Sequence, residues 1–247
     1  MISPQVAPLA PKCVCIDKEK TMRDLYNKQL LDLGNEIVQM GHLCSDALAG
    51  AIKSLHEKDI DLANKIQKSD NLIDAKEREI EQMCLNIFLH QQPIASDLRM
   101  VSAALKMITD LERIGDQASD IAEIVACIDF KEQAHFAIIE EMATIAQKMV
   151  KESVEAFANS DVALAKSVIE ADDMVDDLLE KVRLLMVDLI VEHNHNAVTI
   201  IDLCMIAKYL ERIGDHAVNV ANWAVFRVLG EHPDKHAAQS VAGTLAV

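Results

Sequence analysis

The sequence predicts an all-α fold of six helices, arranged as two tandem three-helix bundles with an approximate twofold relation. Half of the 247 residues are hydrophobic but only 3% are aromatic, and 7 Gly and 5 Pro leave little material for hairpins and tight turns. Apolar residues recur every three or four positions over most of the chain, as on helix faces. The hexapeptide LERIGD occurs at 111–116 and again, letter for letter, at 210–215.

Five breaks in the helical pattern separate the predicted helices. They lie near Lys58, at HQQP, near Ile128, near Asn159 and at HNHN. The predicted helices are 22–57, 59–90, 96–127, 131–159, 161–192 and 197–229. We expect four segments: a flexible tail at 1–20, a first bundle at 21–129, a second bundle at 130–229 and a second flexible tail at 230–247.

The two predicted bundles are copies of one unit. Asp59 and Asp161 are both suited to cap the helix that follows, and they lie 102 positions apart. The same offset relates two D-x-x-x-D pairs, which are Asp70 with Asp74 and Asp172 with Asp176. The two LERIGD segments lie 99 positions apart, so the preceding loop is three residues shorter in the second copy.

The third predicted helix is expected to be central. Leu111, Gly115 and Ala118 follow one face at helical spacing, whereas Ile114 and Ile121 fall on the opposite side. A helix that is apolar on two sides packs against more than one neighbour.

Composition excludes several function classes. With 24 basic and 40 acidic side chains the net charge is −16, which disfavours nucleic acid and anionic lipid as partners and suits cations or basic protein surfaces. The cysteines form no disulfide framework, and those in helical patterns (Cys44, Cys84, Cys127 and Cys204) are expected to be small buried hydrophobes in a reducing compartment. No apolar run has the length of a membrane span, so we expect a cytoplasmic protein.

A stripe of oxygen ligands runs along each copy. At about 100° per residue, the acidic and amide residues of the LERIGD helices lie on one line beside the core face. These are Glu112, Asp116 and Asp120 in the first copy, and Glu211, Asp215 and Asn219 in the second. The preceding helices add Asp70, Asp74, Asp172 and Asp176. Hard cations prefer such ligands, and helical bundles build metal sites from facing helices. We therefore expect a metal site in each copy.

The alternative is a solvated acidic face, paired with residues such as Arg113 and Arg212. Like charges four residues apart destabilise a helix by about 0.2–0.5 kcal/mol per pair. A glycine inside a helix costs about 1 kcal/mol relative to alanine. The repeated Gly115 and Gly214 are better understood if a neighbouring helix or a ligand approaches closely there.

A second function class stays open, a metal-dependent enzyme or metal-storage protein that uses the same carboxylates. A di-iron bundle would show two Glu-x-x-His pairs, and only Glu132 with His135 fits that pattern. The sequence has no glycine-rich phosphate loop and no nucleophile motif. We therefore expect a binding protein rather than an enzyme.

The segments QQPIASDLRMVSAALKMITDLERIGDQASDIAE (91–123) and LERIGDHAVNVANWAV (210–225), each after a D-x-x-x-D helix, resemble the PhoU family of phosphate-transport accessory proteins. The resemblance covers about residues 22–229. It implies the six-helix fold, a cytoplasmic and often homodimeric protein, and multinuclear metal clusters of iron or of zinc, manganese or magnesium. It also implies action with the high-affinity phosphate ABC transporter and the phosphate-sensing histidine kinase, damping phosphate-starvation signalling.

Carried over by position, the cluster residues implied by the resemblance are the nine carboxylates and one amide named above. The second copy has HNHNAVTIIDLC where the first has the Q-P-x-A-x-D-L-R segment. A role of Asp97 and Arg99 is therefore expected in the first copy alone.

Overall fold

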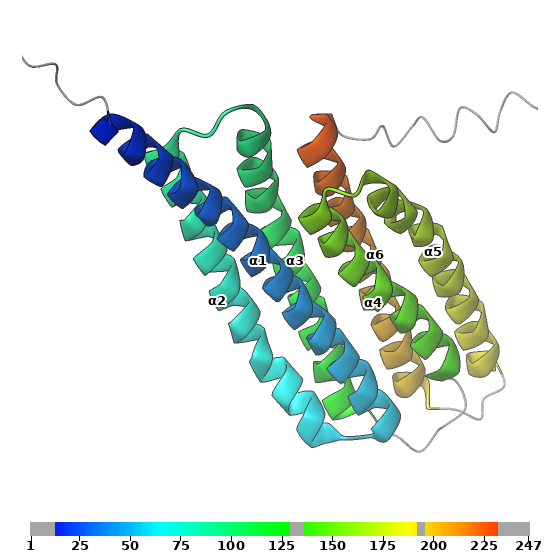
Figure 1. Cartoon of the computed structure of the whole chain (residues 1–247). Helices are drawn as coiled ribbons and strands as arrows, with labels where there is room; N and C mark the ends of the chain where they lie inside the picture. Colours follow the sequence, from blue (N-terminus) through cyan, green and yellow to red (C-terminus); the bar gives the residue numbers. More distant parts are fainter. Residues whose placement is uncertain (1–12, 129–135, 192–195, 232–247) are drawn as a thin grey trace, which may run out of the picture.

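The computed structural model describes residues 13–128, 136–191 and 196–231. Within these ranges the chain forms six helices and no strand, which confirms the predicted class (Figure 1). The helices are α1 (Cys13–Glu57), α2 (Ile60–Gln91), α3 (Ala95–Cys127), α4 (Phe136–Asn159), α5 (Val162–Val191) and α6 (Ala197–Leu229). Residues 131–135 and 192, which were predicted as helical, and the Glu132–His135 pair lie outside the described residues.

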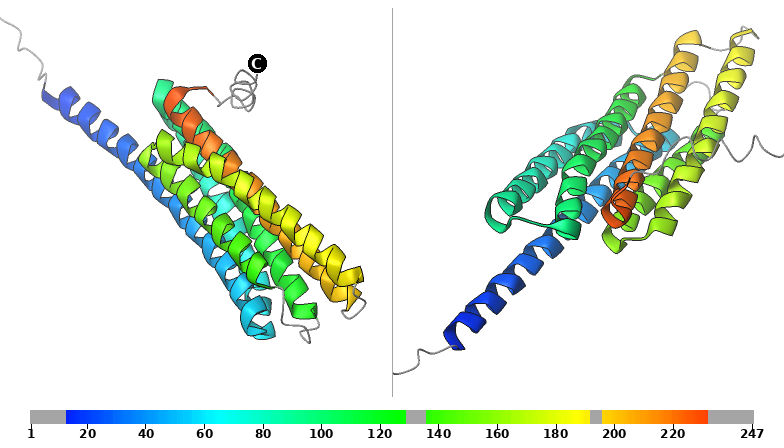
Figure 2. Two further views of the ribbon diagram at one scale, coloured as in Figure 1. Left: turned by 90° about the vertical axis from the view of Figure 1, so that its right-hand side faces the viewer. Right: turned by 90° about the horizontal axis from the view of Figure 1, so that it is seen from above.

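The helices pack as two three-helix bundles, α1–α2–α3 and α4–α5–α6, side by side. Two contacts join the bundles, one between α3 and α6 and one between α1 and α4 (Figure 2). The α3–α6 pair is antiparallel. Arg99, near the start of α3, donates to the carbonyl of Arg227 at the end of α6 at 3.3 Å.

Side-chain caps set the helix starts. Asp59 Oδ1 accepts from the Leu62 amide at 2.9 Å, and Asp161 Oδ1 accepts from the amides of Ala163 and Leu164 at 3.0 Å each. Both predicted caps are thereby confirmed, and each satisfies backbone donors that the first helical turn leaves free.

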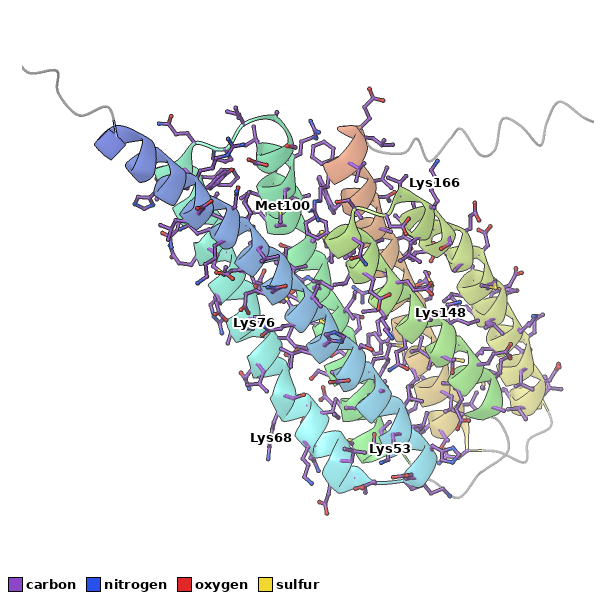
Figure 3. The ribbon with its side chains drawn as sticks, in the orientation of Figure 1. Lys53, Lys68, Lys76, Met100, Lys148 and Lys166 are labelled. Atoms are coloured by element: carbon purple, nitrogen blue, oxygen red, sulfur yellow. The ribbon has the colours of Figure 1, made fainter. Side chains whose placement is uncertain are left out.

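The core is apolar and continuous, and α3 and α6 are its central helices. Leu111, Ile114 and Ile121 are fully buried, although they lie on different sides of α3. The prediction that α3 packs on more than one face is therefore confirmed. Among polar contacts between helices, Lys76 Nζ on α2 lies 2.7 Å from Glu36 Oε2 on α1 (Figure 3).

The first helix is longer than predicted. It begins at Cys13, so residues 13–20, which were assigned to the flexible tail, are helical. Its N-terminal part projects past the other helices (Figure 2). The apolar spacing of a core helix could not predict this segment, because packing against the bundle does not define its face.

The cysteines were predicted only partly correctly. Cys44 and Cys84 are buried, Cys204 is half-buried and Cys127 is exposed. Cys127 is the last residue of α3 and faces solvent, although the next residue, Ile128, is buried in the core.

Candidate carboxylate sites

The first site lies between α2 and α3 and contains five of the predicted ligands. We call these residues the first carboxylate group, and they are Asp70, Asp74, Glu112, Asp116 and Asp120. The pKa of Asp70 is raised, first by burial and then by repulsion from Asp116, Asp74 and Asp120. Burial followed by the charge of Asp116 likewise raises the pKa of Glu112. The structure thus brings the first-copy residues together.

Gly115 allows the close approach of α2 to α3 at this site. A Cβ atom on Gly115 would lie 2.7 Å from Ile73 Cδ1 and 3.3 Å from Asp70 Oδ1. A larger residue would press first on Ile73 and also on the carboxylate. The expected reason for a glycine within this helix is therefore present in the structure.

Asp70 Oδ1 is buried and has no hydrogen-bond partner within the described residues. An unpaired buried carboxylate oxygen is costly, because it has lost water without gaining a donor. Such an atom is a natural ligand for a cation.

Arginines neutralise only the rim of the first carboxylate group. Arg113 Nη1 lies 3.1 Å from Asp116 Oδ2, and Arg78 Nη1 lies 3.8 Å from Asp74 Oδ2. Both arginine side chains are more than half exposed, so their contribution is screened by solvent. The solvated-face alternative thus accounts for the rim and not for Asp70.

The second site repeats this arrangement between α5 and α6. Its residues, the second carboxylate group, are Asp172, Asp176, Glu211 and Asp215. A Cβ atom on Gly214 would lie 3.2 Å from Asp172 Oδ1, as at the first site. Burial, followed by repulsion from Asp215 and Asp176, raises the pKa of Asp172 to about 6. Lys208 Nζ partly neutralises this group, because it lies 2.6 Å from Glu211 Oε2.

Asn219 also makes a contact across to the other bundle. Its side-chain nitrogen donates to Asp110 Oδ1 on α3 at 3.1 Å, and His216 Nδ1 lies 2.9 Å from the same oxygen. Asn219 therefore contributes to the contact between the bundles, and a ligand role for it stays a prediction. The contact of Asp110 with Asn219 has an equivalent with the two copies exchanged. In it, Asp120 on α3 pairs with the hydroxyl of Tyr209 on α6.

The donor chemistry of both groups fits hard cations, because the ligands are carboxylate oxygens and one of them is buried and unpaired. Within the described ranges, no three His, Cys, Asp or Glu side chains form a ready metal-ion site. Side-chain rotation within each group would be needed for several carboxylates to share one ion.

Several polar residues were missed by the sequence reasoning. Asp110 and Tyr209 are repeat equivalents, 99 positions apart, and that offset was the available signal for the two contacts between the bundles. Asp97 accepts from the Tyr26 hydroxyl at 3.0 Å and Arg99 bonds the end of α6, so both have structural roles in the first copy. A cavity of about 330 Å³ opens between α1 and α4, on other helices than the carboxylates, and is separate from both sites.

Fold and sites together define a duplicated helical-bundle protein with one carboxylate group in each copy. The PhoU domain matches residues 37–125 and 139–224, one match in each bundle. The chain therefore belongs to the PhoU family.

Individual relatives agree with this membership. The phosphate-specific transport system accessory protein PhoU homolog of Pseudomonas aeruginosa is 33% identical over 207 residues, 83% of this chain and 86% of that protein. The homolog of Aquifex aeolicus is 35% identical over 205 residues, 83% of this chain and 93% of that protein. The crystal structure of PhoU from Pseudomonas aeruginosa superposes with a TM-score of 0.79 at 32% identity, covering 83% of this chain and all of that one.

None of the helices in the described part of the chain is both long and apolar enough to span a membrane.

Proposed function

We propose that this chain is a cytoplasmic accessory protein of high-affinity phosphate uptake. It modulates the phosphate ABC transporter and the phosphate-sensing histidine kinase, and it represses the phosphate-starvation response. The observation that carries the proposal is the match of both bundles to the PhoU domain, with relatives named as phosphate-specific transport system accessory proteins over most of their length.

The two carboxylate groups belong to this proposal as metal sites, with iron as the first candidate. The unpaired Asp70 Oδ1 and the repeated approach of an aspartate to a helix glycine support this assignment. A bound cation would supply the positive charge that each group lacks and would hold the two helices of each site together. Asp70, Asp74, Glu112, Asp116 and Asp120 would hold it in the first copy, and Asp172, Asp176, Glu211 and Asp215 in the second.

Deletion of the gene tests the regulatory role. A phosphate-responsive reporter should stay active at high phosphate in the deletion strain and return to repression when the gene is restored. Normal repression without the gene would contradict the regulatory role. An unchanged phosphate response with an altered cellular iron or manganese content would favour the metal-storage alternative.

A further inference from the structure

One end of the second bundle leaves large apolar side chains in solvent. It lies where α5 ends and α6 begins, two segments that are adjacent in the bundle (Figure 1). The residues of this surface, which we call the apolar ridge, are Leu184, Val187, Ile190, Val191, Val198, Ile201 and Met205, and their exposed fractions run from 41% to 67%. Apolar surface gathered in this way is typical of interaction sites, whereas single exposed apolar residues are common everywhere.

Comparison with the first copy shows that folding does not require the ridge. The offsets of 102 and 99 are supported by the structure, because they place Asp172 on Gly214 as Asp70 lies on Gly115. With these offsets, Leu184, Ile201 and Met205 correspond to Gln82, Ser102 and Lys106. Val198 likewise corresponds to Arg99. Polar residues therefore occupy the equivalent helix positions in the first copy. Val187 and Val191 correspond to Leu85 and Leu89, which are also exposed, so the four polar positions make the difference between the copies.

The charges around the ridge define its partner. Within Leu184–Val191 and Val198–Met205 the charged residues are Asp188 and Asp202, both acidic. Of the basic side chains just inside the ridge, Arg183 lies 3.1 Å from Glu180 and Lys208 lies 2.6 Å from Glu211, whereas Lys181 is exposed. The second carboxylate group continues along the same two helices.

This pattern disfavours two other occupants. A second copy of the chain would bring the same apolar residues with the same two aspartates, because a twofold contact uses the same patch on both sides, and it would offer no complementary cluster of basic residues. An anionic lipid surface would be repelled by these aspartates and by the net charge of −16.

We propose that the apolar ridge docks an amphipathic helix of a protein partner, with apolar side chains against the ridge and Lys or Arg facing the acidic residues around it. This inference rests on the proposed function, since an accessory protein acts by contact. From Asp176 to Val191, α5 rises about 22 Å, so a partner helix of about four turns would span both the ridge and the acidic residues.

Photo-crosslinking in cells tests the proposal. The protein would carry benzoylphenylalanine in place of Val187, and mass spectrometry would identify the crosslinked segment. We expect a helical segment of another protein with apolar residues and at least two Lys or Arg, and loss of at least 80% of the product in the variant Leu184→Gln, Ile201→Ser, Met205→Lys. That variant takes its residues from the first copy, so it should fold, which circular dichroism checks. The same probe at Leu72, which is 58% exposed on α2, should not capture that segment.

Complementation of the deletion strain is the second arm. The triple variant should leave the reporter at least fivefold more active at high phosphate than the wild type does, and Asp188→Lys should act in the same direction. The control variants Leu72→Lys and Glu141→Lys, which change exposed residues of α2 and α4, should repress normally.

The outcomes separate the ridge from the proposed function. Crosslinks to a second copy, to lipid or to an acidic segment would overturn the docking proposal, as would the absence of any crosslink. Normal repression by the triple variant would also overturn the docking proposal. The regulatory role would still be supported in that case, by the phenotype of the deletion strain. If the deletion strain itself represses normally, the regulatory role fails, and the crosslinked sequence alone decides whether the ridge docks a basic amphipathic helix.

Discussion

At the scale of single residues, one glycine and one aspartate account for the repetition of LERIGD. A Cβ atom on Gly115 or Gly214 would lie 3.3 Å or 3.2 Å from an aspartate oxygen of the neighbouring helix. Leucine and isoleucine of the motif fill the core, since Leu111 and Ile114 are fully buried. The motif therefore combines packing with the placement of a carboxylate.

Alanine substitution at Gly115 should destabilise the protein despite the better helix propensity of alanine. The new methyl group would meet Ile73 Cδ1 at 2.7 Å and Cγ2 at 3.1 Å, and Ile73 is itself buried. We expect a loss of about 1–3 kcal/mol in the free energy of unfolding, the usual cost of overpacking.

Gly34→Ala is the matched control for that substitution. Its new methyl group would meet only Met100 Cε, at an ordinary 3.7 Å, so we expect a gain of up to about 1 kcal/mol. Urea unfolding of both variants measures the difference, and equal effects of the two substitutions would contradict the packing argument.

Asp172 should make the metal-free protein less stable as pH rises. Its pKa in the fold is raised from 3.8 to about 6, so between these values the folded state binds protons that the unfolded state has released. Stability is therefore lost as pH rises through this interval. Asp172→Asn should raise the free energy of unfolding at pH 7.5 by about 1–2 kcal/mol, an amount reduced by solvent screening of this half-exposed side chain, and much less at pH 4.

Denaturation in a chelator at both pH values measures the effect of Asp172→Asn. Asp177→Asn, an exposed change of equal charge on the same helix, serves as the control. A gain that is the same at pH 4 and pH 7.5 would contradict the assignment to Asp172.

At the scale of elements, the helix caps should have measurable energies. Asp161→Ala removes the acceptor of two backbone amides at the start of α5 and should cost about 1 kcal/mol. Glu170→Ala, an exposed change within α5, should alter the free energy of unfolding by less than about 0.5 kcal/mol. Thermal or urea unfolding compares the two variants, and an equal cost would mean that Asp161 contributes no cap.

Local signals made most of the helices predictable. Capping aspartates and apolar periodicity act within one helix, which is why the observed starts of α2 and α5 lie within one residue of the predicted ones. The acidic stripes were predictable for the same reason, because Glu112, Asp116 and Asp120 share a helix face whatever the helix packs against.

Features that depend on the neighbouring bundle were not predictable in this way. Asn219 follows the stripe on its own helix, and its side chain also reaches Asp110 on α3. The projecting start of α1 likewise depends on where the bundle ends. Helix periodicity gives the face of a residue and not the neighbour that this face meets.

At the scale of the whole molecule, the antiparallel contact of α3 with α6 relates the two copies. Asp110 pairs with Asn219, and the equivalent residues Tyr209 and Asp120 pair with each other. The twofold relation is thus visible in side-chain contacts and not only in helix order. It also gives the molecule two comparable carboxylate sites with different numbers of charges.

Metal binding should therefore be tighter in the first copy than in the second. The first carboxylate group has five acidic residues, the second has four, and Asn219 replaces Asp120 in the repeat. Hard cations gain more from a carboxylate than from an amide oxygen. Without metal, Asp116→Asn and Asp215→Asn should both raise the melting temperature, because each relieves repulsion. With a cation bound, each removes a ligand, so the sign should reverse, with the larger loss for Asp116→Asn.

Thermal unfolding after chelation, and again after addition of iron(II), manganese(II) or zinc(II), measures both signs for the wild type and the two variants. Metal content of each preparation supplies the independent reading. Asp177→Asn should lack the reversal, since Asp177 is not part of either carboxylate group. If every preparation is free of metal and no added ion changes a melting curve, the carboxylate groups are not metal sites. The unpaired oxygen of Asp70 would then be available to a basic residue of a partner. In that case the same variants are expected to change partner binding and to leave metal content unchanged.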